Sequence, residues 1–204
     1  MTRARPAAAA PVIRPLTPAR WKDLTQLFGP RGACGGCWCM WWRLPRSEYN
    51  RRQGAGNREA FRRLVRRGPA PGLLAYLDGQ PAAWVAVAPR GTYPGLGRSR
   101  VLAPIDERPV WSVVCLFVDR RFRRRGLTVA LLQSAADHVR RRGGRILEGY
   151  PIDALGQPVP AAFAWTGLAS AFRRAGFREV ARRSPTRPIM RKVLRARRAV
   201  RSTV

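Results

Sequence analysis

The most constraining feature of the sequence is an almost continuous apolar run, Val110 to Asp119, that leads into an arginine-rich turn and an amphipathic helix. The run is rich in β-branched residues, which predicts a strand buried on both faces. Five of the six residues from Arg120 to Arg125 are arginine, and Gly126 follows them. From Leu127 to Arg142 apolar residues recur at helical spacing. The helix therefore anchors the turn to a packed core, which a freely solvated charge run would not need.

The turn also has the features of a phosphate-binding site. A helix N-terminus presents unpaired backbone N–H groups and the positive end of the helix dipole, which together suit an anion. A glycine at position 126 lets the backbone approach a ligand closely. Two interpretations of the arginines follow: a surface for nucleic acid, or a cradle for the phosphates of a cofactor.

The charge of the whole chain favours neither interpretation by itself. The chain has 40 Lys and Arg against 11 Asp and Glu, a net charge of +29, and only Lys22 and Lys192 are lysines. Together with abundant Ala, Gly and Pro, this composition is what a GC-rich coding sequence produces. The charge attracts polyanions and acidic small molecules, and salt should weaken that attraction. No zinc-finger, helix-turn-helix or basic-aromatic signature is present, so nucleic acid is the less favoured partner.

The remaining segments predict one α/β domain over residues 11–194, between a flexible leader (1–10) and a basic tail (195–204). Asp78-Gly79 lies between two apolar runs and predicts a β-hairpin with a type I′ turn. Residues 91–109 have no clear period and are expected to be a long connection. The further elements expected are a first strand at 12–16, helices at 17–28, 57–67 and 167–175, and strands at 145–153, 178–183 and 188–194. This order predicts a mostly antiparallel sheet with one helical crossover.

The central unit resembles a known family. "VDRRFRRRGLTVALL" is similar to the acetyl-CoA-binding motif R/Q-x-x-G-x-G/A of the GNAT superfamily of N-acetyltransferases. Arg123 takes the R/Q place, Gly126 takes the first glycine, and Thr128 stands where the family has Gly or Ala. The resemblance covers Gly72 to Val193, including "FRRAGF". It implies a GNAT-like α/β fold: a mixed, mostly antiparallel central sheet flanked by helices and splayed at the cofactor site.

The resemblance also implies an activity and a set of binding groups. The chain would transfer an acetyl group from acetyl-CoA to a primary amine of an unidentified small-molecule or protein acceptor, by direct attack on the thioester. The backbone of Leu116, Phe117 and Val118 would bind the pantetheine arm. The backbone amides that would hold the pyrophosphate are those of Arg123, Arg124, Arg125, Gly126, Leu127 and Thr128. The alternatives are a nucleic-acid-binding basic protein and a catalytically silent acyl-CoA-binding module.

The acid and base of such a reaction are not in the family's usual places. Phe172 stands where the family often has a tyrosine acid, and Trp165 where an asparagine often touches pantetheine. The motif strand carries no carboxylate, so Glu148 and Tyr150 on the following strand are the nearest candidates, with Cys115 a weaker third. Strand alternation places Glu148 and Tyr150 on one face. The competing hypothesis is that Glu148 only pairs with an arginine.

A cysteine-rich segment raises the question of a metal. Cys34, Cys37 and Cys39 form C-x2-C-x-C, and Cys115 or His138 would have to supply a fourth zinc ligand. The spacing lacks a second cysteine pair, so we expect no metal. His138, alone on a helix flank, is expected to be solvated.

Aromatic residues fill the rest of this segment. By the resemblance, the region between the first and second strands forms one wall of the acceptor site, so Trp38, Trp41 and Trp42 would shape an apolar or cation-accepting pocket. Packing of the same residues into the core is the alternative. A strongly cationic acceptor is disfavoured by the surface charge unless an acidic pocket of Asp106, Glu107 and Glu148 offsets it.

The sequence gives few indications of cellular context. Prolines interrupt the short apolar run near the N-terminus, which argues against a secretory signal, and no apolar run is long enough to span a membrane. Four cysteines in such a chain are expected to be cytosolic thiols, so a cytoplasmic location is predicted. The oligomeric state stays open.

Overall fold

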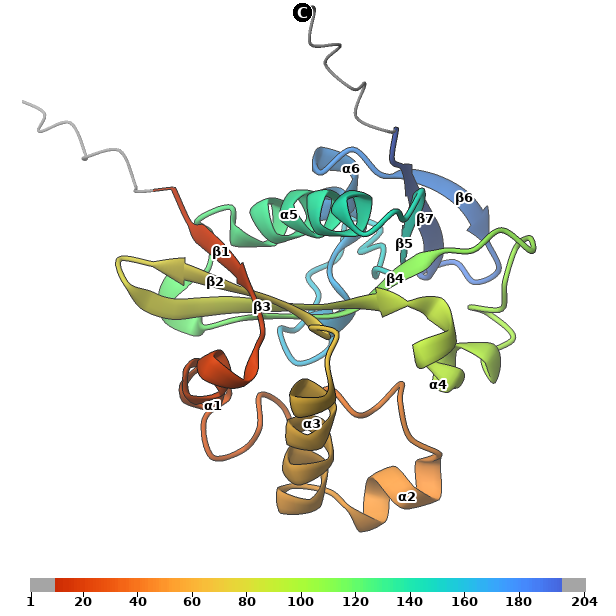
Figure 1. Ribbon diagram of the computed structural model, residues 1–204. Helices are drawn as coiled ribbons and strands as arrows, with labels where there is room; N and C mark the ends of the chain where they lie inside the picture. Colours follow the sequence, from red (N-terminus) through yellow and green to blue (C-terminus); the bar gives the residue numbers. More distant parts are fainter. Residues whose placement is uncertain (1–9, 196–204) are drawn as a thin grey trace, which may run out of the picture.

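The protein is described here by a computed structural model covering residues 10–195, which forms a seven-stranded sheet (Figure 1). The strands are β1 (Val12–Pro15), β2 (Gly72–Leu77), β3 (Gln80–Pro89), β4 (Trp111–Val118), β5 (Ile146–Gly149), β6 (Arg178–Arg182) and β7 (Pro188–Val193). Their order in the sheet is β1-β2-β3-β4-β5-β7-β6, and only β4 and β5 pair in parallel. The predicted mostly antiparallel sheet with one helical crossover is therefore confirmed.

Helices cover both faces of this sheet (Figure 1). One face carries α1 (Trp21–Phe28), α2 (Arg46–Arg51), α3 (Ala55–Arg67) and α4 (Pro94–Gly97), and the other carries α5 (Leu127–Arg141) and α6 (Ala169–Arg174). Short 3-10 turns are η1 (Pro18–Arg20), η2 (Arg90–Thr92), η3 (Arg120–Phe122) and η4 (Ala164–Thr166). The β-branched and small residues of β3 and β4 are buried on both faces because each face packs against its own layer of helices.

The hairpin that joins β2 to β3 has the predicted turn. Asp78 and Gly79 have φ angles of 52° and 74°, and Leu77 pairs with Gln80 across the turn. Positive φ at both central residues is what a type I′ turn requires, and its twist matches that of the flanking strands. The hairpin brings β3 against β4, where the motif strand lies.

The central feature of the sheet is a split between β4 and β5. The two strands pair only from Trp111 to Val113 on β4, opposite Leu147 to Gly149 on β5. On the other side β4 stays paired with β3, although Val114 is skipped at a bulge between Val113 and Cys115. Beyond Val113 the β5-facing edge of β4 thus has no strand partner within residues 10–195. Two strands that diverge in this way expose backbone groups to a ligand.

The segment 91–109 contains the short helix α4, tied to the Trp-rich segment by a hydrogen bond from the Gly95 amide to the Trp42 carbonyl (2.9 Å). In α5, Leu127 is buried and Thr128 half-buried, so the apolar face of the helix begins at its first residue. The predicted leader and tail fall, apart from Ala10 and Arg195, outside the described residues. No helix within the described part of the chain is long and apolar enough to cross a bilayer.

Candidate active site

The arginine-rich turn has a well-defined backbone. Asp119 accepts a hydrogen bond from the Arg121 amide (2.9 Å) and so starts η3. Arg124 and Gly126 both have positive φ, 61° and 76°, and Gly126 is the N-cap of α5. An alternation of left- and right-handed residues turns successive amides toward one side, which is the backbone pattern of anion-binding nests. Leu127 is 2% exposed and holds the start of the helix on the core.

The amides of this turn are free of protein acceptors. Within residues 10–195 none of the six N–H groups from Arg123 to Thr128 donates a hydrogen bond to the backbone or to a side chain. A methyl group added at Gly126 would meet nothing within 4 Å, so the space in front of the turn is open. Unpaired donors at the start of a 15-residue helix can bind phosphate oxygens. The structure therefore brings together the six residues that the motif predicts for the pyrophosphate.

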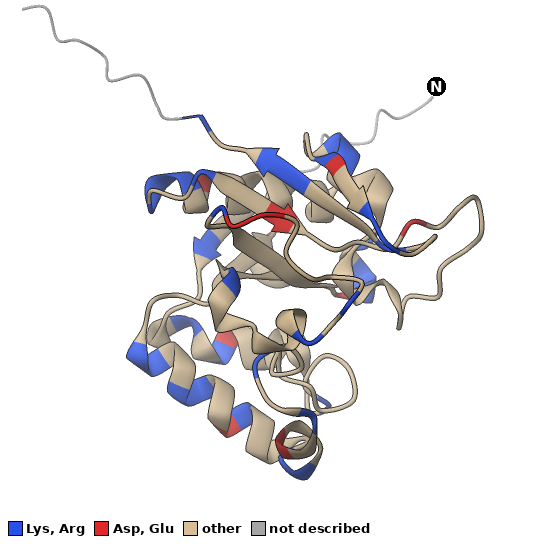
Figure 2. Ribbon diagram, turned by 90° about the vertical axis from the view of Figure 1, so that its right-hand side faces the viewer, with Lys and Arg blue, Asp and Glu red and all other residues tan. Residues whose placement is uncertain are grey.

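The arginine side chains of the turn differ in their partners. Arg121 forms an ion pair with Asp119 (2.9 Å), which lowers the pKa of that carboxyl, and the Arg123 Nε donates to the Val118 carbonyl (3.3 Å). Arg124 and Arg125 are exposed and make no ion pair or hydrogen bond with the rest of the described chain. Basic residues occur on most elements visible in Figure 2, so the number of basic residues alone marks no site.

The end of β4 lies next to the turn. Leu116, Phe117 and Val118 pair with β3 on one side, and the split leaves their other side without a strand partner within the described residues. In an antiparallel pair, alternate backbone groups point to either side. The unpaired edge ends at Val118 and the free amides begin at Arg123, so only the short turn of residues 119–122 separates them along the chain.

Phe172 packs beneath the split. Its side chain is fully buried, and its ring contacts Phe177 with centroids 4.9 Å apart. A Cβ added at Gly149 would lie 2.2 Å from this ring, and one added at Gly167 would lie 2.8 Å from it. Glycine at both positions makes room for the ring, which has no titratable group. An apolar side chain therefore occupies this place beneath the split.

Glu148 and Tyr150 do meet, inside a buried polar network. The Tyr150 hydroxyl donates to Glu148 Oε1 (2.6 Å) and lies 2.9 Å from the Ser112 Oγ. Arg90 Nη1 donates to the same carboxylate oxygen (3.1 Å) and also contacts the Tyr150 hydroxyl. Arg191 Nε donates to Glu148 Oε2 (2.6 Å). Burial, and then the negative charge of Glu148, raise the pKa of Tyr150 well above its ordinary value.

The network continues to Asp106, which receives bonds of 2.7 and 3.1 Å from the Arg191 guanidinium. Bonds from Arg191 and Arg108 lower the pKa of Asp106, so it is ionised and paired. Asp106 and Glu148 are thus both paired with arginines, so these two carboxylates offer no unpaired charge to a cationic acceptor. Sequence reasoning missed Arg90, Ser112 and Arg191. Strand register could have identified two of them, because Glu148 lies opposite Ser112 of β4 and opposite Arg191 of β7.

The cysteines do not form a metal centre. Cys39 and Cys115 are buried with their sulfurs 3.8 Å apart, and the Trp84 indole donates to Cys39 (3.1 Å). Cys34 is exposed, and burial raises the pKa of Cys37 to about 11, which disfavours the thiolate that a metal needs. Across residues 10–195 no three His, Cys, Asp or Glu side chains are grouped for metal binding.

The tryptophans of the same segment divide between two environments. Trp38 is 3% exposed and packs against Trp21 and Phe28, so it belongs to the core rather than to an acceptor wall. Trp41 and Trp42 instead meet Trp165 of η4, with ring centroids 6.3 and 5.9 Å apart. The segment that contains Trp41 and Trp42 therefore packs against η4, which follows β5 in the chain. A guanidinium, that of Arg46, lies 3.9 Å from the Trp41 ring.

His138 is not solvated, contrary to expectation. Its side chain is 4% exposed in the layer of α5, where its ring is 6.3 Å from that of Trp111, and its Nε2 has no partner among the described residues. Burial, with help from Arg142 and Arg141, lowers its pKa to about 4. It lies in the layer opposite Cys39 and Cys115, so it cannot complete a zinc site with them.

Comparison with known proteins agrees with this geometry. Residues 38–150, more than half of the chain, match the Acetyltransferase (GNAT) family. Among solved structures, a GNAT-family acetyltransferase from Streptococcus agalactiae 2603 is 14% identical, with a TM-score of 0.54 over 92% of this chain and 97% of that one. The PaiA N-acetyltransferase of Thermoplasma acidophilum, solved with coenzyme A, is 13% identical, with a TM-score of 0.52 over 91% and 99%. A search of curated protein sequences finds no match. At such identities the solved structures establish the fold alone.

Proposed function

The chain belongs to the acetyltransferase (GNAT) family, and on that premise we propose that it transfers the acetyl group of acetyl-CoA to a primary amine by direct attack. The observation that carries the proposal is the row of six unpaired amides, Arg123 to Thr128, beside the open edge of β4. A cradle of this kind suits a pyrophosphate, because each amide supplies a donor without the entropy cost of ordering a side chain. Arg124 and Arg125 add charge near the same place.

The pantetheine arm would lie along β4. The backbone groups of Leu116, Phe117 and Val118 that face away from β3 would take its amides, as an added strand would. Acetyl-CoA bound in this way would bring its thioester toward the split between β4 and β5. Thioester chemistry then needs a base for the ammonium of the acceptor and an acid for the leaving thiolate.

Glu148 and Tyr150 are the groups we assign to these proton transfers. The 2.6 Å hydrogen bond between them allows a proton to move along the pair. The Ser112 hydroxyl, on β4, continues this chain of hydrogen bonds from Tyr150. Both side chains are about 1% exposed, so the proton would reach the amine through a water molecule. The competing role is purely structural, since arginines occupy both carboxylate oxygens.

Replacing Tyr150 with Phe distinguishes these roles. A proton-transfer role predicts a fall in kcat of at least about a hundredfold with little change in the KM for acetyl-CoA. Tyr93→Phe, which removes another buried tyrosine hydroxyl, one that accepts from Arg43 outside this cluster, serves as the structural control. If Tyr150→Phe lowers only the melting temperature and leaves kcat intact, the pair supports the fold and takes no part in catalysis.

The acceptor would approach Trp41, Trp42 and Trp165. Ring faces accept alkylammonium groups as well as apolar ones, and Arg46 shows that the face of Trp41 accommodates a cation. With no free carboxylate in the Glu148 cluster, an acceptor with a single amine on an apolar or aromatic body fits better than a polycation. The amine belongs to a small molecule or to a protein. The four unpaired thiols fit the reducing cytoplasm expected for such an enzyme.

The direct experiment measures thiol release from acetyl-CoA across a panel of amines, which includes monoamines, polyamines and peptide N-termini. We expect saturable release that depends on the amine. Binding of acetyl-CoA without release for any amine would favour the catalytically silent module. Loss of both, with nucleic-acid binding that persists at physiological salt, would favour the basic nucleic-acid-binding protein.

A further inference from the structure

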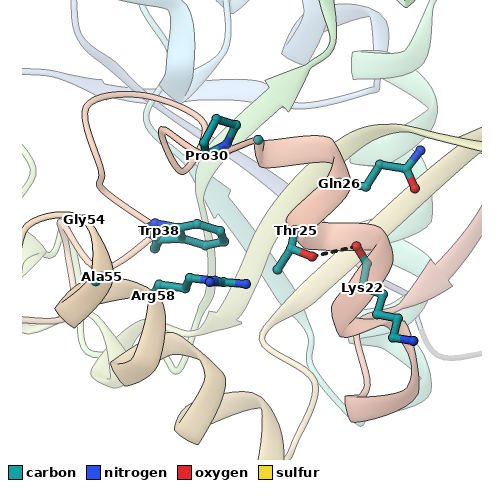
Figure 3. Close-up of a pocket in the computed structure, with 9 residues that line it drawn as sticks. Lys22, Thr25, Gln26, Pro30, Trp38, Gly54, Ala55 and Arg58 are labelled. Carbon is teal, nitrogen blue, oxygen red and sulfur yellow. Dashed lines mark hydrogen bonds between the residues drawn. The ribbon is translucent and has the colours of Figure 1, made fainter.

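A cavity of about 600 Å³ opens between α1 and the start of α3, and none of its lining residues belongs to β4, β5 or the arginine-rich turn (Figure 3). The residues that line it are Lys22, Thr25, Gln26, Gly29, Pro30, Trp38, Gly54, Ala55 and Arg58. Its size falls within the roughly 300–1,000 Å³ typical of small-molecule sites. The acetyl-CoA cradle makes no use of this cavity.

The charge of the lining is positive only. Lys22 and Arg58 are its charged residues, and no Asp or Glu lines it. Neither cation has a carboxylate within 4 Å in residues 10–195, whereas Arg52 and Arg63 on the same side of the molecule are paired with Glu48 and Glu59. The two cations lie on opposite sides of one opening, Lys22 on α1 and Arg58 on α3, and without a counter-charge both favour a ligand with negative charge (Figure 3).

The cavity also has an ordered aromatic wall. The Arg58 guanidinium lies 5.4 Å from the Trp38 ring, and both side chains point across the opening toward Thr25 (Figure 3). Thr25 is fixed by a hydrogen bond from its hydroxyl to the Lys22 carbonyl (2.8 Å). Stacking against a ring restricts the guanidinium, so less entropy is lost when it binds a ligand.

The backbone that presents Trp38 is strained. Trp38 and Cys39 are consecutive non-glycine residues with positive φ, 43° and 57°. Such conformations persist only where the surroundings enforce them, and they concentrate at functional sites. Here packing of Trp38 on Trp21 and contact of Cys39 with Cys115 of β4 hold the pair in place. The strain sets the Trp38 ring at the edge of the cavity.

We propose that this cavity is a second binding site, for a small anion with carboxylate or phosphate groups, held by the Arg58 guanidinium and the Lys22 ammonium against Trp38. The apolar surfaces of Pro30 and Ala55 leave room for a non-polar body on the ligand. The proposal does not depend on acetyl transfer, because the cradle and the cavity share no residue.

Calorimetric titration of the whole protein with citrate, and separately with inorganic phosphate, tests the proposal and distinguishes the two anion sources. Arg58→Gln and Lys22→Gln should each weaken the tighter of the two anions about tenfold. Ala55→Leu should weaken it as well, because the larger side chain fills the opening and leaves every charge in place. Arg62→Gln, one turn further along α3 and outside the lining, removes the same charge and should change the affinity less than twofold.

Two results would overturn the proposal. One is the absence of saturable binding of either anion at millimolar concentration. The other is an equal weakening by Arg62→Gln and Arg58→Gln with no effect of Ala55→Leu, which is the pattern of general attraction to a basic surface. Because the readout is binding alone, a protein that fails to transfer acetyl groups can still pass this test.

Discussion

Two arginine-containing regions of the molecule use their polar groups in opposite ways. In the turn from Arg120 to Arg125 the backbone amides at the start of α5 have no protein partner, and Arg124 and Arg125 are exposed. Around Glu148 the guanidiniums of Arg90 and Arg191 are fully engaged with carboxylates, a hydroxyl and a backbone carbonyl. The first region keeps hydrogen-bonding capacity for a ligand, and the second uses its capacity within the fold.

The contrast shows which arginines carry information about binding. A buried ion pair that satisfies itself says more about the arrangement of strands than about a ligand, since removing one partner leaves a costly unpaired charge. An exposed guanidinium contributes little to stability and remains available. The amides of the turn, rather than the number of arginines around them, thus distinguish the binding region.

The largest expected effect is on stability and concerns the buried cluster around Glu148. Glu148→Ala leaves the Arg90 and Arg191 charges without their shared carboxylate and should lower the free energy of unfolding by about 3–5 kcal/mol. Glu59→Ala, which removes an exposed partner 3.7 Å from Arg63, should cost less than about 0.5 kcal/mol. Urea unfolding measures both. If both substitutions lower the unfolding free energy equally, the buried ion pairs of Glu148 contribute no more to stability than an exposed pair does.

The next effect concerns the exposed side, and α5 provides its own control. Gly126 and Gly143 lie at opposite ends of this helix with φ of 76° and 79°, and neither has an atom within 4 Å of an added Cβ. Alanine at either position should cost about 1 kcal/mol of stability through backbone strain. Only Gly126→Ala should weaken acetyl-CoA binding, by about a hundredfold, because its methyl group enters the cradle. Similar affinities for the two variants in calorimetry would argue against the cradle.

A smaller effect follows from the buried His138. Its pKa is lowered to about 4, so below its ordinary value of 6.5 the unfolded chain binds a proton that the folded chain does not. Stability is therefore fully present above pH 6.5 and is lost as the pH falls toward 4, by about 2 kcal/mol between pH 6.5 and 5. The His138→Phe variant lacks this contribution. The difference in unfolding free energy between the natural protein and the variant should therefore change by about 2 kcal/mol between pH 6.5 and 5. If the unfolding free energies of the two proteins instead change with pH in parallel, His138 takes up its proton as readily in the folded chain as in the unfolded chain.

The smallest effect is that of a single exposed arginine. Arg124→Gln should weaken acetyl-CoA about threefold to fivefold at low salt, with the difference shrinking as salt screens the charge, and should leave the melting temperature unchanged. Arg178→Gln, an exposed arginine of β6 remote from the cradle, should change neither quantity. If Arg124→Gln weakens acetyl-CoA binding as much as Gly126→Ala does, the arginine side chains rather than the backbone amides hold the ligand.

The sequence was sufficient for features that depend on neighbours along the chain. The hairpin at Asp78, the buried strand β4 and the start of α5 at Gly126 all follow from local patterns, and each is present. The motif residues also come together as predicted, because they are nearly consecutive.

Features that depend on packing between distant elements could not be read in this way. The partners of Glu148 come from η2 and β7, and no local pattern indicates that Arg90 and Arg191 converge on it. His138, a lone histidine on a helix flank, is predicted to be solvated, yet α5 turns it toward Trp111. The same limit applies to Trp38, whose core position and cavity follow from the packing of α1 and α3.

The most direct test of the cradle is amide hydrogen exchange, resolved by residue, with and without acetyl-CoA. The account predicts that the amides from Arg123 to Thr128, which have no acceptor in residues 10–195, become protected when acetyl-CoA binds, while exchange around Glu148 stays the same. Binding of acetyl-CoA with unchanged exchange in the turn, or with protection only elsewhere, would contradict it.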